Sequence, residues 1–418
     1  MTNFEQDKWD VLEAEIQEVF SPGAPIRERE LFSGRIEQVS QLLDAVRQNG
    51  KHAVIFGDPG VGKTSLANTF ALGVSAVSSK ITAIKINCQP EDTFTSLWKR
   101  VFKRLQFQLD QDGQSVVRSV ADDYNGEIQP DDVQYELGNF SANVAPVVIL
   151  DEFNSIQDSS LTGKISKVIK DLSDYSVNCT IVVVGVASDV SELIEGHTSI
   201  IRQLSQIPMP RMSMTELQVL LLSRVKRLGM KLDHDLSWRM SFLSRGMPYF
   251  THLLGQHSAI SAVRRKSMKI DEKDFDTGIA LSLKEVDQIL KQQYIDGTMS
   301  RKDDTIYEPV LLACALAETD ELGRFAQKSV EEPLAAVIKK KRYKSTTYAF
   351  HMNEFCTEKR RNLLENVSSS TGNNPRYRFT EPLMQPYVIL RGIAQGLITR
   401  SVSENLIPER QPSLFSND

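Results

Sequence analysis

The stretch Val54–Phe70, VIFGDPGVGKTSLANTF, decides the fold of this chain. An apolar strand pattern leads into a glycine-rich turn, and a helical pattern follows from about Lys63. Glycines allow the backbone N–H groups of such a turn to surround phosphate oxygens, and the helix adds the positive end of its dipole. The stretch therefore predicts a loop that holds the phosphates of a nucleotide.

The turn carries the complete spacing of a P-loop, with Gly57, Gly62, Lys63 and Thr64 in place. We expect Lys63 to act on the β- and γ-phosphates and to be needed for catalysis, and Thr64 to offer its hydroxyl to Mg²⁺. The strand before and the helix after favour this interpretation over an ordinary glycine turn. The residues expected to bind the nucleotide are Gly57, Asp58, Pro59, Gly60, Val61, Gly62, Lys63, Thr64 and Ser65.

A second motif, PVVILDEF at 146–153, ends in two carboxylates. Strands of a parallel sheet end at one edge, so this strand would bring Asp151 and Glu152 beside the P-loop. Asp151 would hold Mg²⁺, directly or through water, and Glu152 would act as the general base on the attacking water. An acidic strand end alone is weak evidence, but together with a P-loop it predicts a catalytic site.

Two further catalytic candidates follow. Ser188, after the strand pattern at 180–187, could reach the γ-phosphate or the water, or could instead cap a helix. Arg202, in HTSIIRQL at 197–204, could project toward the nucleotide of a neighbouring subunit, where arginine stabilises transferred charge. The alternative for Arg202 is an ordinary surface residue, and we expect the nearby His197 to be structural.

Alternating strand and helix patterns predict an α/β fold with a parallel sheet. We expect an irregular, acidic surface insertion between Asp110 and Leu137. The expected strands are 52–56, 81–87, 146–153, 180–187 and, as a possible fifth, 205–210, and the expected helices include 63–72 and 93–105.

The pattern changes at Arg211, where a capping box from Ser213 to Glu216 opens a run of helices without strands. A polar linker at 296–304 precedes three amphipathic segments and a hairpin with its turn at 372–375, the order of a winged helix. The expected domains are an N-terminal helical segment at 1–50, a P-loop ATPase domain at 51–210, a helical lid at 211–295 and a winged-helix domain at 296–418.

Composition favours a soluble globular protein, since 41% of the 418 residues are hydrophobic and 25% are charged. No apolar run is long enough to span a membrane, and the N-terminus lacks the order of a signal peptide. Four widely spaced cysteines predict neither a zinc site nor disulfides, so we expect a cytoplasmic protein. The net charge of −5 means that any nucleic-acid surface must be local.

Basic residues do cluster locally in the C-terminal part, in IKKKRYKSTTY, EKRRN and the hairpin. Such residues on a winged helix would contact phosphates of duplex DNA. The alternative is a solvated basic face on a domain that binds protein. The candidates for DNA contact are Lys340, Lys341, Arg342, Lys344, Arg360, Arg376 and Arg378.

Together these motifs resemble the AAA+ ATPases and, within that class, the origin-recognition (ORC-like) and replication-licensing ATPases, over roughly Phe32–Leu397. LFSGR, GDPGVGKT and VVILDEF match family motifs, VVVGVAS is similar to the sensor-1 strand with Ser188 in place of the usual asparagine, and Arg202 falls where the arginine finger is expected. SRGMPYFTHLL is similar to the sensor-2 helix. The usual arginine there falls near Tyr249. Either Arg245, one turn earlier, would substitute for it, or closure of the lid would sense the nucleotide only weakly.

The resemblance implies that ATP and Mg²⁺ bind between the first two domains at a subunit edge. It also implies slow hydrolysis as an assembly switch, and a homo-oligomer or a complex with a partner protein. The DNA-contacting insertion of cellular initiators is not evident, so the chain looks closer to bacterial, mobile-element or defence-associated relatives. The alternative function is a signalling ATPase whose winged helix binds a partner protein, as in anti-phage defence, or a transposition regulator.

Overall fold

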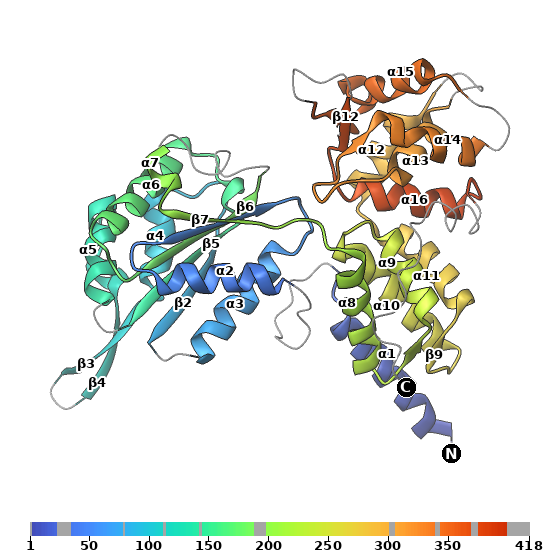
Figure 1. The fold of residues 1–418 in the computed structure, drawn as a ribbon. Coiled ribbons are helices and arrows are strands. Elements are labelled where there is room, and N and C mark those ends of the chain that lie inside the picture. The colour runs from blue at the N-terminus through green and yellow to red at the C-terminus, as the bar shows by residue number, and fades with distance from the viewer. Residues whose placement is uncertain are drawn as a thin grey trace. The chain divides into compact units, whose positions relative to one another are not determined.

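The computed structural model describes residues 2–22, 35–77, 80–111, 114–141, 144–187, 198–300, 306–338, 343–368 and 375–398. Contacts divide the chain into two compact units, drawn in Figure 1. The P-loop unit comprises residues 24–210. The helical unit joins residues 1–23 to residues 211–418.

A five-stranded parallel sheet forms the centre of the P-loop unit, in the order β2-β5-β6-β1-β7. Val, Ile and Leu fill its strands, and β5 and β6 are buried over nearly their whole length, as strands covered on both faces must be. The predicted α/β fold and its fifth strand are confirmed. The strands are β1 (His52–Gly57), β2 (Ile81–Asn87), β5 (Ala145–Asp151), β6 (Thr180–Val186) and β7 (Leu204–Pro208).

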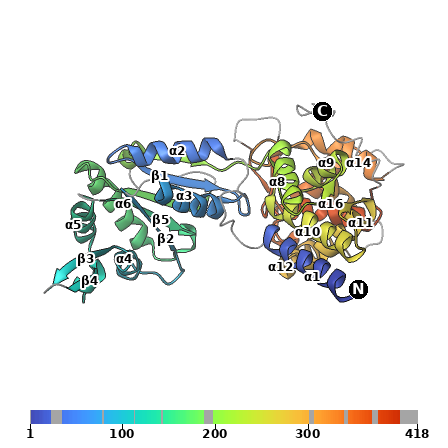
Figure 2. The ribbon, with the colours of Figure 1, turned by 90° about the horizontal axis from the view of Figure 1, so that it is seen from below.

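Helices cover both faces of this sheet (Figures 1 and 2). On one face, Ile84 and Ile86 of β2 join a core with Trp98 and Phe102 of α4 and Leu161 of α6. The other face carries α2 and α3. The helices of this unit are α2 (Ile36–Arg47), α3 (Lys63–Val77), α4 (Phe94–Phe102), α5 (Pro130–Phe140), α6 (Ser159–Asp174) and the short α7 (Thr198–Ile201).

The acidic stretch between Asp110 and Leu137 is more ordered than predicted. It contains most of an antiparallel hairpin, β3 (Gln106–Gln111) with β4 (Gln114–Ser119), then a 3₁₀ turn and α5. Val133 and Leu137 are fully buried one helical turn apart, so α5 packs on the core even though Asp131 and Asp132 begin it. Acidic residues at a helix start are favourable for the helix dipole, and the prediction mistook them for a solvated loop.

The helical unit begins with α1 (Thr2–Val19), which packs against α10 (Pro248–Arg264). Phe20 is fully buried there, and a Cβ at Gly255 would lie 2.4 Å from its ring. His252 Nδ1 accepts the Ser21 N–H at 3.1 Å, and Gln256 donates to the Phe20 carbonyl at 2.9 Å. The expected segment 1–50 is thus divided, with α1 in the helical unit and α2 in the P-loop unit.

The capping box predicted at Ser213 and Glu216 is present and starts α8. The prediction of no strand in this region was wrong, because β8 (Lys231–Leu232) and β9 (Lys269–Ile270) form a short parallel pair. The other helices here are α9 (His234–Leu243), α11 (Glu272–Glu285) and α12 (Gln288–Thr298), and α8 spans Met214–Arg227. The end of α12 therefore overlaps the start of the linker expected at 296–304.

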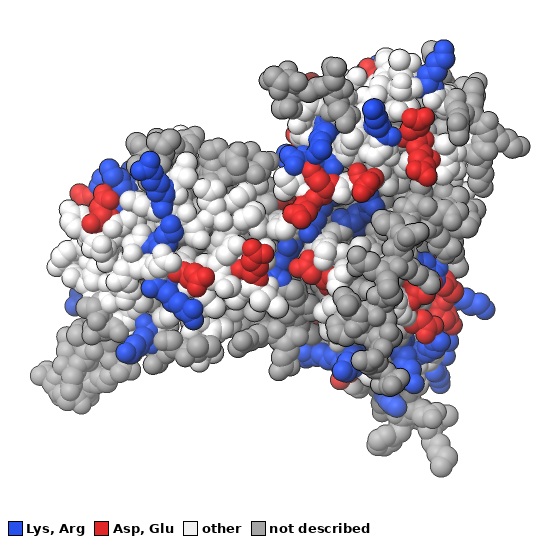
Figure 3. Space-filling view, in the orientation of Figure 1, with Lys and Arg blue, Asp and Glu red and all other residues white. Residues whose placement is uncertain are grey.

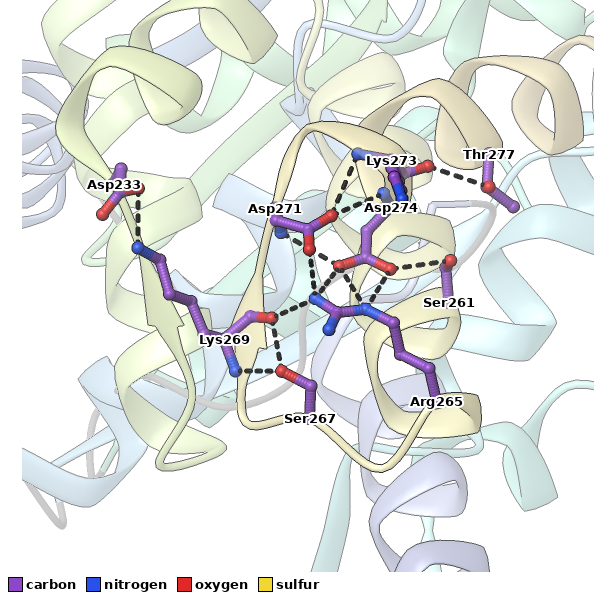
Figure 4. A network of polar contacts seen from close by, with 9 residues as sticks. All are labelled: Asp233, Ser261, Arg265, Ser267, Lys269, Asp271, Lys273, Asp274 and Thr277. Carbon is purple, nitrogen blue, oxygen red and sulfur yellow. Dashed lines mark hydrogen bonds and ion pairs between the residues drawn. The ribbon is translucent and has the colours of Figure 1, made fainter.

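Figure 4 shows the hydrogen bonds and ion pairs beside the strands β8 and β9. Arg265 donates to both carboxylate oxygens of the buried Asp274 and pairs with Asp271 at 2.8 Å. Lys269 pairs with Asp233 at 3.0 Å. Basic residues of this unit are thus often held by acidic neighbours.

The C-terminal part has three helices followed by an antiparallel strand pair, in the predicted order. A further strand, β10 (Phe325–Ala326), pairs with β12 to make a three-stranded sheet. The expected turn residues 372–374 lie outside the described part of the chain. The elements are α13 (Tyr307–Leu316), α14 (Glu331–Ile338), α15 (Ser345–Phe355), β11 (Leu364–Asn366), β12 (Arg376–Phe379) and α16 (Met384–Ala394). In the described ranges, no helix has the length and apolar character needed to cross a lipid bilayer.

Candidate nucleotide-binding site

The P-loop connects β1 to α3 at the carboxyl edge of the sheet. Gly57 has φ +152°, and a Cβ on it would lie 2.4 Å from the Met209 carbonyl oxygen. Gly62 has φ +96°, a conformation that residues with side chains rarely adopt. Both glycines are therefore required by the backbone path, and the residues from Gly60 to Ser65 follow it into the first turn of α3.

Lys63 is buried and its ammonium is held by the loop itself. Its Nζ donates to the Gly57 carbonyl at 2.9 Å and to the Asp58 carbonyl at 2.7 Å. Burial lowers the pKa of Lys63 to about 8, while the charges of Asp58 and Asp151 act in the opposite direction. A phosphate would offer this partly desolvated ammonium a stronger partner than two neutral carbonyls.

Asp151, at the end of β5, is only 1% exposed. Its Oδ1 accepts the Thr64 hydroxyl at 3.3 Å and the Glu152 N–H at 3.0 Å, so two motifs 87 residues apart in sequence meet. A carboxylate and a hydroxyl side by side are the oxygen donors that Mg²⁺ prefers. The residues present therefore fit the metal that the sequence predicted.

Glu152 has an unusual backbone conformation for a residue with a side chain. Its φ is +57°, and it lies between β5 and a 3₁₀ turn at Phe153–Ser155. The side chain is exposed, directly after the buried Asp151. Left-handed non-glycine residues cost roughly 1–3 kcal/mol and occur preferentially at functional sites. The conformation turns Glu152 out of the strand line, where water can reach it.

Lys85 is a residue of this site that the sequence analysis missed. Its Nζ lies 2.8 Å from Asp151 Oδ2. The signal was a lysine inside the otherwise apolar strand ITAIKIN, because a lysine in a buried strand requires a carboxylate partner.

Arg35, the last residue of LFSGR, also reaches this region. It is buried with φ +61°, and its Nη2 donates to the Val61 carbonyl at 3.2 Å and to the Pro210 carbonyl at 2.6 Å. The guanidinium therefore joins the P-loop to the last residue of the P-loop unit.

Of the two remaining catalytic candidates, the structure describes Arg202 but not Ser188. Arg202 lies exposed in the turn between α7 and β7, and its backbone carbonyl accepts Lys51 Nζ at 3.0 Å. Its guanidinium has no partner among the described residues. Ser188 and His197 lie outside the described ranges. The end of β6 nearby is tied to the turn after Asp151, because Val186 N–H donates to Asn154 Oδ1 at 2.8 Å.

The suggested sensor-2 substitute is engaged elsewhere. Arg245 donates to the Ala317 carbonyl within the helical unit, and its guanidinium lies over the Phe242 ring at 5.3 Å. Burial lowers its pKa to about 10, with Arg211 adding to the effect. Tyr249 packs edge-on against Phe250. All of these contacts lie within the helical unit.

Among the candidates for DNA contact, Arg360 requires a correction. It is buried, donates to the Gly297 carbonyl at 3.0 Å and the Met299 carbonyl at 2.7 Å, and lies over the Tyr307 ring at 3.6 Å. Its guanidinium holds the end of α12, so it is not available to DNA. The basic run was treated as one exposed face, although the chain turns inward at this residue.

The other described candidates lie at the surface but two of them are paired. Arg376 lies 3.4 Å from Asp320, and Arg378 pairs with Glu365 on the neighbouring strand. Lys344 is exposed immediately before α15. Lys340, Lys341 and Arg342 lie outside the described residues. On the face in Figure 3, basic and acidic side chains are interspersed over this part.

The sheet order, the P-loop and the acidic strand end that meets it are those of a P-loop NTPase. The sequence matches the family described as Novel STAND NTPase 1 over residues 25–246, which is more than half of the chain. The chain belongs to this family. No match was found among curated proteins.

Solved structures support the fold assignment. The Aeropyrum pernix ORC2 protein, in its ADPNP and ADP complexes, is similar with a TM-score of 0.50 and 15% identity, over 93% of this chain and 97% of that one. A Walker-type ATPase of Pyrococcus abyssi is similar with a TM-score of 0.51 and 14% identity, over 88% and 99% of the two chains. At such identities the likeness establishes the fold, and the family match establishes the NTPase class.

Proposed function

We propose that this protein binds ATP with Mg²⁺ and hydrolyses ATP slowly, as a cytoplasmic switch that controls its own assembly. The observation that carries the proposal is the meeting of Lys63, Thr64, Asp151 and Glu152 at one edge of the sheet. These are the side chains that P-loop hydrolysis requires, and they come from separate segments of the chain.

Each residue has a defined role in this proposal. Lys63 would exchange its two loop carbonyls for the β- and γ-phosphate oxygens. Thr64 and Asp151 would hold Mg²⁺, which neutralises charge on the phosphates when bound. Glu152 would orient the attacking water and accept its proton, a role that its exposed carboxylate permits.

Arg202 is proposed to act on the nucleotide of a neighbouring subunit. Its exposure and its lack of a described side-chain partner support this role. Mixing Lys63→Ala protein with Arg202→Ala protein tests it, because mixed interfaces would combine an intact P-loop with an intact Arg202. We expect each variant to be inactive and the mixture to regain turnover. An Arg202→Ala variant with normal turnover would remove the residue from the site.

The first experiment is ATP turnover by the purified protein with and without plasmid-length duplex DNA, with Lys63→Ala as the blank. Turnover stimulated by DNA would support a DNA-associated switch. Turnover that is indifferent to DNA would favour regulation by a protein. No turnover above the blank in either condition, with or without added DNA, would contradict the proposed hydrolysis itself.

The DNA contact is proposed for the C-terminal part, taken as a winged helix, because Lys344 is exposed at the start of α15 and follows a basic run in the sequence. A specific observation favours a second candidate, a partner protein. Helix α15 contains no lysine or arginine, and its Phe350 is 57% exposed. Such a switch would suit anti-phage defence or the regulation of transposition.

Salt dependence separates the two candidates. Phosphate contacts release counterions, so DNA binding would weaken steeply between 50 and 200 mM salt. Binding of a partner protein through an exposed aromatic face would change little over that range.

A further inference from the structure

Lys85 lies beside Asp151 in the proposed ATP site, so its role described below rests on that proposed function. Strand β2 alternates its side chains between two faces. Ile84 and Ile86 are buried in the core with α4, so Lys85 lies on the opposite face, toward α3. The register places Lys85 beside Ile149 and Asn87 beside Asp151 on the neighbouring strand β5.

The backbone around Lys85 is held from outside the sheet. Arg104 of the turn after α4 donates to the Lys85 carbonyl, and Arg100 of α4 donates to the Asn87 carbonyl at 3.0 Å. Arg100 is itself paired with the buried Asp92. These contacts fix the edge strand, so Lys85 is presented to Asp151 by a rigid element rather than by a loose side chain.

The two oxygens of Asp151 have separate partners. Oδ1 faces Thr64 and the Glu152 N–H, and Oδ2 faces the Lys85 ammonium at 2.8 Å. The Lys85 side chain is 17% exposed and that of Asp151 is 2% exposed, so water screens the pair little. The expected Mg²⁺ ligand therefore already has a unit positive charge bound to it.

We propose that Lys85 is a built-in competitor of Mg²⁺ at Asp151. A second cation beside the carboxylate repels the metal and reduces the charge that attracts it. Lys85 thereby stabilises Asp151 when no metal is present, and it limits how strongly Mg²⁺ strengthens nucleotide binding. It is a positioning residue for Asp151 and takes no part in the reaction itself.

The test measures affinity instead of turnover. ATP dissociation constants are determined in EDTA and in saturating Mg²⁺, in the Glu152→Gln background so that ATP is not consumed. The ratio of the two constants is the strengthening by Mg²⁺. We expect this ratio to be about tenfold larger in Lys85→Met than with Lys85 present, since the repelling charge is gone.

Lys103→Met is the matched control, because Lys103 is exposed at the end of α4 and belongs to no described ion pair. Its ratio should equal that of the parent. The nucleotide-free Lys85→Met protein should also melt at a lower temperature, because its buried Asp151 has lost a counter-ion. A ratio in Lys85→Met equal to or below the parent value would overturn the proposal.

Lys85→Arg keeps the positive charge and tests the proposed competition with Mg²⁺ if Lys85→Met does not fold. Its ratio should lie at or below the parent value, and a ratio above it would contradict competition by charge. Failure of the proposed function would look different, since the parent protein would then bind no ATP in either condition.

Discussion

The edge of the parallel sheet and the C-terminal strand pair use charged residues in opposite ways. At the sheet edge, Lys63 and Asp151 are buried and are held by groups that a nucleotide or a metal could replace. In the C-terminal part, Arg378 and Arg360 are tied to Glu365 and to backbone carbonyls of their own unit. The charged groups at the sheet edge can therefore exchange their partners for a ligand, whereas those in the C-terminal part stabilise the fold.

The difference shows which sequence signals can be trusted for function. A P-loop constrains backbone conformation, spacing and neighbouring elements together, so a match predicts geometry. A run of basic residues constrains only charge, and the partner of each residue depends on how the chain folds around it. Variants at the two sites should therefore differ in what they disturb.

The largest effect is expected from Lys63→Ala. Removal of the ammonium should lower ATP affinity by at least about 100-fold, because a charge-assisted contact to two phosphates is lost in a buried site. Titration with a fluorescent ATP analogue measures it, and Lys103→Ala serves as the control. The melting temperature should change little, since Lys63 bonds only to carbonyls of its own loop. If Lys63→Ala bound ATP about as tightly as the parent, Lys63 would not be a ligand-binding group, and the difference between the two regions would be wrong.

Glu152→Gln should leave ATP binding intact and lower turnover by a factor of about 100 to 10,000, the usual contribution of a general base. The bound ATP should then accumulate with the assembled form, which size-exclusion chromatography with light scattering would detect. Glu318→Gln, in the helical unit, is the matched control. Normal turnover by Glu152→Gln would show that another group activates the water.

The sequence predicted the sheet and the meeting of the two motifs because these depend on local patterns. Apolar strands of β-branched residues, the P-loop spacing and the acidic strand end each carry their own geometry. The order of the five strands was not predicted, since it depends on long-range packing. Lys85 was missed although it interrupts a buried strand, because its partner lies on another strand. Arg360 was misplaced because the carbonyls that it binds, at Gly297 and Met299, lie far away in the sequence.

Three further features of the fold could not be predicted because each depends on contacts that the local sequence does not show. The acidic start of α5 resembled a loop in composition, yet Val133 and Leu137 one turn apart bury it. The two-residue strands β8 and β9 carry too little pattern to be seen in a sequence. The docking of α1 on α10 depends on Gly255, whose role follows only from the close approach of Phe20.

A smaller effect, on protein stability, is expected when the packing of α1 against α10 is disturbed. Gly255→Ala should destabilise the helical unit by about 1–3 kcal/mol, because the new Cβ would lie 2.4 Å from the Phe20 ring and 2.8 Å from Leu221. Gly163→Ala in α6 is the matched control, since a Cβ there meets nothing within 4 Å and alanine favours a helix. Urea denaturation followed by tryptophan fluorescence measures both. Equal stability of the two variants would contradict the packing of α1.

The smallest effect is expected from His52, which is fully buried in β1 and accepts the Ile181 N–H through Nδ1 at 2.9 Å. Burial is the main cause that lowers its pKa from 6.5 to about 4. The unfolded chain therefore binds a proton first as the pH falls, so stability is complete above pH 6.5 and is lost progressively toward pH 4. The loss from this one group should be about 1 kcal/mol at pH 6 and about 2 kcal/mol at pH 5.

His52→Asn keeps an acceptor for Ile181 and cannot titrate, so it should flatten this part of the pH dependence. His252 in the helical unit provides the comparison, because burial also holds its pKa well below the usual value while Nδ1 accepts the Ser21 N–H. Denaturation at pH 7.5 and pH 5, with Trp98 reporting on the P-loop unit and Trp238 on the helical unit, separates the two. His52→Asn should reduce the loss of stability between pH 7.5 and pH 5 that Trp98 reports. The loss that Trp238 reports should stay the same. If the pH dependence of stability reported by Trp98 were unchanged, the pKa of His52 would have to be the same in the folded and the unfolded chain, which would contradict the effect of its burial.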